Sequence, residues 1–122
     1  MSETVSLDPQ EKELFRDSIR RFLASEVAPD YEKWEDAGIW PRELWNKLGE
    51  NGFLCVDVPS AYGGYDASFE LSCVVAEELS RGGYAALASG VSVHSDIVAP
   101  YILHLGSEAQ KQHWLPGMVT GE

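Results

Sequence analysis

Three adjacent residues, His94-Ser95-Asp96, carry the side-chain types of a nucleophilic triad. The segment around them has helical periodicity, and neighbours on a helix point about 100° apart. The three side chains therefore cannot line up as nucleophile, base and orienting acid, and we predict no catalytic residue in this chain.

The histidines and cysteines offer little as metal ligands. His94, His104 and His113 follow one another at intervals of ten and nine residues, which does not place them on one helical face. No HExxH motif accompanies them. Cys55 and Cys73 are isolated, so we predict small buried hydrophobic residues and neither a disulfide nor a metal site.

Two further motifs are weaker still. Glu77-Glu78 lies in an acidic helical stretch and is predicted to be a solvated face, not an acid/base couple. The sequence contains neither GxGxxG after a strand nor GxxxxGK[ST], and Gly63-Gly64 alone is too short to cradle a phosphate. We therefore predict no cofactor-binding residue in this chain.

The charge of the chain restricts its partners. Nine Lys and Arg against 20 Asp and Glu give a formal net charge of -11. Such a field repels nucleic acid, anionic lipid and free coenzyme A. No stretch approaches about 18 apolar residues, so we predict no membrane span. The two isolated cysteines favour a reducing compartment, and we predict a cytoplasmic protein.

Start and stop signals divide the chain into helices. Asp8-Pro9 opens a helix with apolar residues at helical spacing, and Pro29 ends it. Later helices are predicted to close at Gly38, near Gly52 and at Gly82-Gly83. Between the third and fourth helices, residues 53–59 are predicted to be extended.

The second half of the chain is predicted to be equally helical. Residues 84–104 have helical periodicity, with a kink or break near Ala99 because Pro100 lacks an amide donor. The sequence Ser107-Glu108-Ala109-Gln110 is a capping box that opens the last helix. We therefore predict an all-α fold, a bundle of about six helices.

Several landmarks, in this order and spacing, resemble the N-terminal helical domain of the acyl-CoA dehydrogenase family. They cover nearly the whole chain: Val27-Ala28-Pro29, Pro41-Arg42-Glu43-Leu44-Trp45 before Gly52, Val58-Pro59 before Tyr62-Gly63-Gly64, Ala76-Glu77-Glu78-Leu79-Ser80-Arg81, Val93-His94 with Pro100, Gly106-Ser107-Glu108-Ala109-Gln110-Lys111, Trp114-Leu115-Pro116 and Gly121-Glu122.

The resemblance implies that residues 1–122 are one domain of a three-domain flavoenzyme. In such enzymes a carboxylate removes the α-proton of an acyl-CoA thioester, FAD takes a hydride, and an electron-transfer flavoprotein accepts the electrons. The resemblance also implies fatty acid metabolism and a homo-oligomer. The flavin-binding β domain and the C-terminal helical domain would follow Glu122, so this part of the enzyme is predicted to be inactive alone.

One helix in this reading contributes to substrate binding. Ala85, Ala88, Ser89 and Ser92 form a face of small side chains at helical spacing. By resemblance this helix lines the far end of the acyl pocket, which makes Ala88, Ser89 and Ser92 the predicted substrate-binding residues. The alternative is that the small residues only let two helices pack closely.

Other functions fit the same pattern of helices. An acyl-CoA oxidase or a flavin monooxygenase could share the scaffold, and a free-standing helical interaction module would need no chemistry. Whether the reading frame continues past Glu122 separates the module from the enzymes. If domains are missing, residues 84–102 and 53–65 are predicted to expose apolar surface.

Overall fold

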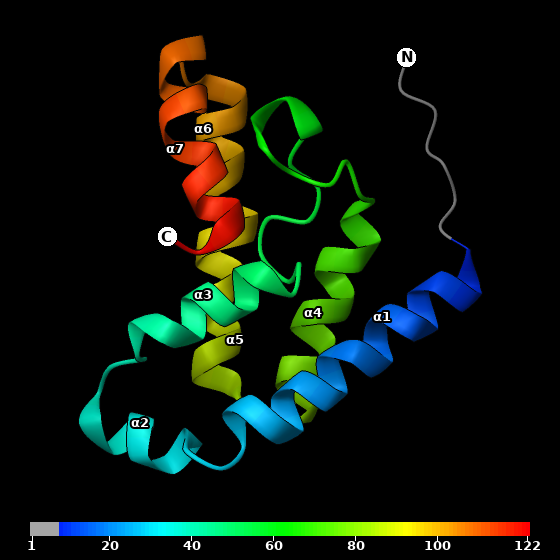
Figure 1. Ribbon diagram of the computed structural model, residues 1–122, viewed down its shortest axis with the longest axis vertical. Coiled ribbons are helices and arrows are strands. Elements are labelled where there is room, and N and C mark those ends of the chain that lie inside the picture. Colours follow the sequence, from blue (N-terminus) through cyan, green and yellow to red (C-terminus); the bar gives the residue numbers. More distant parts are fainter. Residues whose placement is uncertain (1–7) are drawn as a thin grey trace.

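The computed structural model describes residues 8–122, so the first seven residues of the predicted domain lie outside the described part. The described residues form helices and no strand (Figure 1), which confirms the predicted all-α class. The seven α-helices are α1 (Pro9–Phe22), α2 (Tyr31–Ala37), α3 (Arg42–Glu50), α4 (Phe69–Arg81), α5 (Ala85–Ser92), α6 (Ala99–Leu105) and α7 (Glu108–Thr120).

Short non-α segments complete these elements. A π-helical segment, Leu23–Val27, extends α1, and another, Val93–Val98, joins α5 to α6 without a break. A 3-10 turn, Ser60–Tyr62, lies between α3 and α4. Because α5 and α6 are one continuous rod, the described residues form six helical rods, as the sequence predicts.

Three helices begin at a residue whose side chain caps the first free backbone amides. The backbone N–H of Gln10 donates to Asp8 Oδ1 over 2.9 Å, and that of Glu70 donates to Ser68 Oγ over 3.1 Å. At α7 the complete capping box forms, with Ser107 and Gln110 each satisfying the other's backbone N–H. Such caps stabilise a helix because its first amides have no partner within the helix.

The core lies where α1, α3, α4 and α5 meet. Phe53 holds the centre, with edge-to-face contacts to Phe15 at 5.7 Å and Phe22 at 5.3 Å between ring centroids. Such pairs contribute beyond the area they bury. The fifteen buried members of this core are Ile19, Phe22, Leu23, Val27, Tyr31, Leu44, Leu48, Phe53, Leu54, Val74, Val75, Leu79, Leu87, Ala88 and Val91.

A second buried cluster joins residues 53–59 to α6 and α7. Cys55, Val58, Ala99, Leu115 and Val119 are its buried members. The segment is not extended as predicted, because the N–H of Val58 returns to Cys55 O over 3.1 Å and makes a turn. Since these side chains are buried, residues 53–59 are not part of the exposed apolar surface predicted for residues 53–65, in which Tyr65 is exposed.

Cys55 is buried as predicted and has a φ of 50°, a region that few non-glycine residues adopt. Its backbone N–H donates to the buried Ser95 Oγ over 3.0 Å. Burial raises the pKa of its thiol to about 12. Cys73 on α4 is exposed, so its predicted burial is wrong.

Pro100 neither breaks the rod nor ends it. Of the kink or break predicted near Ala99, the break is absent, because the chain continues through the π-helical segment Val93–Val98 into α6. Ala99 N bonds to His94 O, five residues back. The wider turn accommodates a residue that has no N–H to donate and whose ring crowds the preceding turn.

Glu78 ties α1 to α4. Its carboxylate receives Arg16 Nη1 at 2.6 Å and Arg20 Nε at 2.8 Å, and its side chain is only 3% exposed. The predicted solvated face is therefore wrong for Glu78, although Glu77 beside it is exposed. Arg16 and Arg20 stand four residues apart on α1, so both reach one carboxylate.

Two glycines let α3 and the end of α7 touch backbone to backbone. A Cβ on Gly49 would overlap the carbonyl of Thr120, and a Cβ on Gly121 would overlap the carbonyl of Trp45. Gly121 also has a φ of 83°, which ends α7 in a left-handed turn. The position of the C-terminal end relative to α3 thus depends on the absence of two side chains.

Candidate functional site

The predicted substrate-binding residues lie along α5, beside α4. Ala88 is buried in the main core, whose α4 members include Val74, so its small side chain serves close helix packing here. Ser92 is half-buried and Ser89 is exposed. The structure therefore divides the predicted face: one member packs inside the domain, and two remain available to a ligand or to another part of a larger protein.

Asp96 continues this face one turn further. Its carboxylate accepts a hydrogen bond from the hydroxyl of Ser72, a buried residue on α4. The hydrogen-bond partner of this carboxylate therefore lies within the domain. A carboxylate held in this way orders the α4–α5 junction.

The three triad residue types point to different elements. His94 Nε2 lies 2.8 Å from Met118 O on α7. Ser95 bonds the backbone of Cys55, and Asp96 bonds Ser72. Because no two of these side chains contact each other, they cannot act as a catalytic unit, as the sequence predicts.

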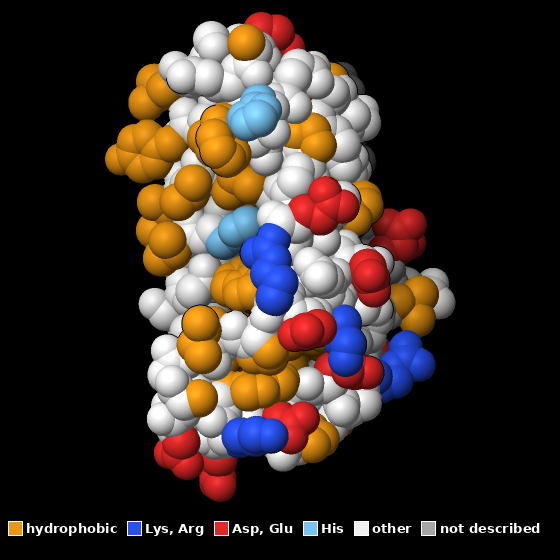
Figure 2. All heavy atoms as spheres, turned by 60° about the vertical axis from the view of Figure 1, so that its left-hand side comes forward, with side chains coloured by type: hydrophobic (Ala, Val, Ile, Leu, Met, Phe, Trp, Pro, Cys, Tyr) orange, Lys and Arg blue, Asp and Glu red, His pale blue; other side chains and the backbone are white. Residues whose placement is uncertain are grey.

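An exposed apolar face lies along α6 and the adjoining α7. It consists of Ile97, Tyr101, Leu105 and Trp114, of which Leu105 is 77% exposed and Tyr101 64%. We call these four residues the α6 face. Figure 2 shows hydrophobic side chains gathered on this upper part of the molecule, with mixed charges below.

Two open grooves run along the α6 face and share Tyr101 and Leu105. One of about 450 Å³ also contacts Asp96, Ile97, Pro100 and His104. The other, of about 360 Å³, also contacts Ile102, Gly106, Gln110 and Trp114. Large exposed apolar patches in soluble proteins usually mark surfaces that another chain, domain or ligand covers.

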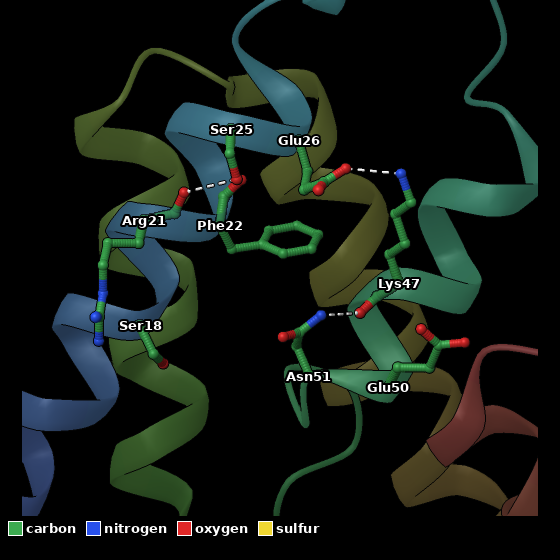
Figure 3. Close-up of a pocket in the computed structure, with 8 residues that line it drawn as sticks. All are labelled: Ser18, Arg21, Phe22, Ser25, Glu26, Lys47, Glu50 and Asn51. Atoms are coloured by element: carbon green, nitrogen blue, oxygen red, sulfur yellow. Dashed lines mark hydrogen bonds and ion pairs between the residues drawn. The ribbon is translucent and has the colours of Figure 1, made fainter.

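A more polar groove of about 530 Å³ lies between the end of the first helix and α3 (Figure 3). Lys47 Nζ donates to Glu26 Oε2 over 2.7 Å across it, and Phe22 points into it. Asn51 Nδ2 donates to Lys47 O over 2.8 Å. These polar groups bond one another, so the groove is a surface junction between helices and not a reaction site.

The pKa of the buried Glu78 carboxylate indicates a structural role and not a catalytic one. The hydrogen bond from Arg20 and that from Arg16 lower the pKa of Glu78, against the opposing effect of burial. A general base near neutral pH needs a raised pKa. Sequence reasoning missed this buried ion pair, although the spacing of Arg16 and Arg20 could have indicated it.

No group of three or more His, Cys, Asp or Glu capable of holding a metal ion occurs among residues 8–122. Gly63-Gly64 is packed on its own chain, with the N–H of Gly64 donating to Pro59 O over 3.1 Å. A Cβ on Gly64 would overlap Val58. The described part therefore offers no open glycine loop for a diphosphate.

Comparison with known proteins identifies this arrangement of helices. The sequence profile of the acyl-CoA dehydrogenase N-terminal domain matches residues 9–122. The chain belongs to the acyl-CoA dehydrogenase family.

Named relatives also align with nearly the whole of this chain but with only part of their own length. The chain is 39% identical to the mitochondrial long-chain specific acyl-CoA dehydrogenase of Sus scrofa, over 92% of this chain and 26% of that enzyme. It therefore spans about a quarter of the length of such curated relatives.

Solved structures agree with the sequence match. An acyl-CoA dehydrogenase from Geobacillus kaustophilus is 47% identical with a TM-score of 0.87, over 97% of this chain and 30% of that one. A glutaryl-CoA dehydrogenase from Mycobacterium smegmatis, solved with FADH2, is 29% identical with a TM-score of 0.84, over 94% and 29% of the two chains.

One helical rod of this acyl-CoA dehydrogenase domain bears on the prediction that the chain has no membrane span. By length and composition alone, Ala85–Leu105 could cross a membrane, with a mean hydropathy of 1.2 over its most apolar window. A single helix of this kind is weak evidence for a span, so the absence of one stays a prediction. Only 28% of that window is buried in the structure. Core helices of soluble proteins meet the same criteria.

Proposed function

We propose that this chain is the N-terminal helical part of a FAD-dependent acyl-CoA dehydrogenase, an oxidoreductase that acts on acyl-CoA thioesters. Family membership supports the scaffold and the reaction class. The observation that carries the proposal is the uncovered rod Ala85–Leu105, whose α6 face presents large apolar side chains to solvent. The rest of a larger enzyme would cover that face.

The role of this domain would be to shape the acyl pocket. Ala88, Ser89 and Ser92 would contact the acyl tail from α5, with Asp96 and Ser72 fixing the helix behind them. The residues that hold FAD and remove the α-proton would lie in other parts of the enzyme. When bound, FAD would accept the hydride; the domain described here would only position the tail and exclude water.

Partners and location follow as parts of the same proposal. The acceptor of the electrons would be an electron-transfer flavoprotein, and the enzyme would be a homo-oligomer without a membrane span. We propose a cytoplasmic location, since free cysteines suit a reducing compartment. Named relatives include mitochondrial enzymes and one from Bacillus subtilis.

The first test is to read the coding sequence beyond codon 122. We expect it to continue into a β-rich domain, and the encoded protein to bind flavin that acyl-CoA reduces under anaerobic conditions. The 122-residue chain alone should be colourless and inactive. A stop codon would favour the interaction module, and rapid reoxidation of the flavin by oxygen would favour the oxidase.

The second test concerns Ser92. In the longer enzyme, Ser92→Phe should fill space used by a long acyl tail, and each displaced methylene costs about 0.8 kcal/mol, or about fourfold in kcat/KM. Displacing two or more methylenes should therefore lower kcat/KM for long-chain substrates by about tenfold or more. Short-chain substrates, which do not reach this space, should change little.

The control is Ser80→Phe, which places the same bulk on an exposed serine at the end of α4. It should leave the chain-length profile unchanged. A Ser92→Phe variant with a uniform drop at every chain length and a lower Tm would assign Ser92 to helix packing and remove it from the pocket.

A further inference from the structure

Four aromatic rings meet where α2 packs on the start of α5, at the lower end of the bundle in Figure 1. Tyr31 stacks on Trp40 at 5.5 Å between centroids and meets Tyr84 edge-on at 4.8 Å. Trp34 and Trp40 stand at right angles, with an interplanar angle of 87° and 6.4 Å between centroids. We call Tyr31, Trp34, Trp40 and Tyr84 the aromatic corner.

The corner opens into a groove of about 380 Å³. Its lining residues are Trp34, Glu35, Gly38, Ile39, Trp40 and Ala86. Both indoles are half-buried, so part of each ring system is in contact with the groove. Gly38 and Ala86 add no bulk, and a Cβ at Gly38 would meet no atom within 4 Å. The groove thus has two perpendicular aromatic walls, an unobstructed side and one carboxylate.

A buried hydroxyl lies beside two of the residues that line this groove. The Tyr31 hydroxyl is inaccessible, and its polar neighbours include the Glu35 carboxylate and the backbone of Ala86 and Leu87. Burial first, and then the neighbouring Glu35 carboxylate, raise the pKa of Tyr31, while the backbone of Ala86 opposes them. Because Glu35 and Ala86 both line the groove, the hydroxyl lies next to it.

The charge around the groove selects the sign of a ligand. Residues 30–36 carry four carboxylates, Asp30, Glu32, Glu35 and Asp36, against the single ammonium of Lys33. Of these, Glu35 lines the groove, and Arg42 lines the adjoining groove beyond Trp40. The chain as a whole carries a formal charge of -11. A cation is attracted to such a site, and an anion such as the CoA moiety is repelled.

We propose that this groove binds a methylated ammonium group. Indoles attract cations held within about 6 Å of the ring centroid, and aromatic cages recognise quaternary ammonium and methylated lysine in this way. The methyl groups suit apolar walls, and the group needs no hydrogen-bond donor or acceptor in return. Glu35 supplies the countercharge at the rim. The site is separate from the proposed acyl contacts and does not depend on the dehydrogenase function.

The probe that tests the proposal is choline, titrated into the 122-residue chain and followed by tryptophan fluorescence and calorimetry. The comparison ligand is 3,3-dimethyl-1-butanol, which has the same shape without the charge. Choline should bind at least about tenfold more tightly than the neutral isostere, since the ring quadrupole acts on the charge. A trimethyl-lysine peptide in a parallel titration shows whether the natural source is a small molecule or a protein side chain.

Variants locate the binding. Trp34→Ala should weaken choline binding about tenfold or more, and Trp34→Phe, which keeps an aromatic wall, should fall between this variant and the parent chain. Glu35→Gln should weaken it about threefold and reduce its salt dependence. Trp114→Ala, at an exposed tryptophan on α7, is the matched control and should bind choline normally.

Equal binding of choline and its neutral isostere would overturn the proposal, because the groove would then act as an apolar surface only. So would normal choline binding by a folded Trp34→Phe or Glu35→Gln variant. These measurements use neither flavin nor acyl-CoA. A failure here therefore leaves the proposed dehydrogenase function standing, and a failure of that function leaves this site standing.

Discussion

Replacing Glu78 by Gln tests the ion pair between α1 and α4 most directly. The change keeps the shape of the side chain and removes the charge that receives Arg16 and Arg20. Arg20 then loses its anionic acceptor, and Arg16, whose side chain is only 12% exposed, keeps only the exposed carboxylates of Glu77 and Glu13.

The magnitude follows from burial. An exposed ion pair contributes about 0.2–1 kcal/mol, and breaking a fully buried one costs about 3–5 kcal/mol. Glu78 is buried and Arg16 is partly buried, but the second partner, Arg20, is half-exposed and partly screened. We therefore expect Glu78→Gln to lower the free energy of unfolding by about 2 kcal/mol, between these limits.

The pH dependence of the free energy of unfolding gives an independent test of this ion pair. The arginines lower the pKa of Glu78 in the folded state. Its contribution is therefore fully present above the unfolded pKa, roughly 4.3, and is lost as the pH falls through the lower folded value. Glu78→Gln should consequently lose less stability on acidification than the parent chain does.

The assay is urea unfolding followed by circular dichroism at neutral and acid pH. The matched control is Glu77→Gln, because Glu77 contacts the same Arg16 at 3.1 Å but is 56% exposed. The control should change stability by no more than about 0.5 kcal/mol. If Glu77→Gln and Glu78→Gln behave alike, or if both keep the parent's pH profile, the reasoning from burial is refuted.

Three further changes test other contacts. Ser107→Ala should cost about 1 kcal/mol of unfolding free energy, while Ser107→Asp should be near neutral; an unchanged urea midpoint for Ala would contradict the cap. Gly49→Ala should lower the free energy of unfolding by about 1–3 kcal/mol, because its methyl group overlaps the Thr120 carbonyl. In the same assay Gly83→Asn should cost less, because Gly83 has a φ of 86° but no neighbouring atom within 4 Å. Leu105→Glu should weaken concentration-dependent self-association in light scattering with little change in Tm, because Leu105 is exposed; a parent chain that stays monomeric at high concentration would argue against an adhesive α6 face.

The sequence by itself determined where most helices begin and end. Asp8, Ser68 and Ser107 cap because a hydroxyl or carboxylate lies within two or three residues of free amides. Gly38 ends α2 because a left-handed residue costs glycine little. These interactions connect residues a few positions apart, so a linear reading captures them. The order and spacing of the motifs also identified the family.

Only the tertiary structure decided which side chains are buried and what they contact. Glu78 and Glu77 are adjacent in sequence and both meet Arg16 of α1, yet only Glu78 is buried and also binds Arg20. Ala88 and Ser89 are equally small, yet one packs in the core and the other faces solvent. The burial of Tyr31 against Tyr84 and Ala86 likewise results from α2 meeting the start of α5. Such outcomes depend on how helices pack across long separations in sequence. Helical periodicity predicts which face of a helix is buried, but it does not predict which residues of another helix contact that face.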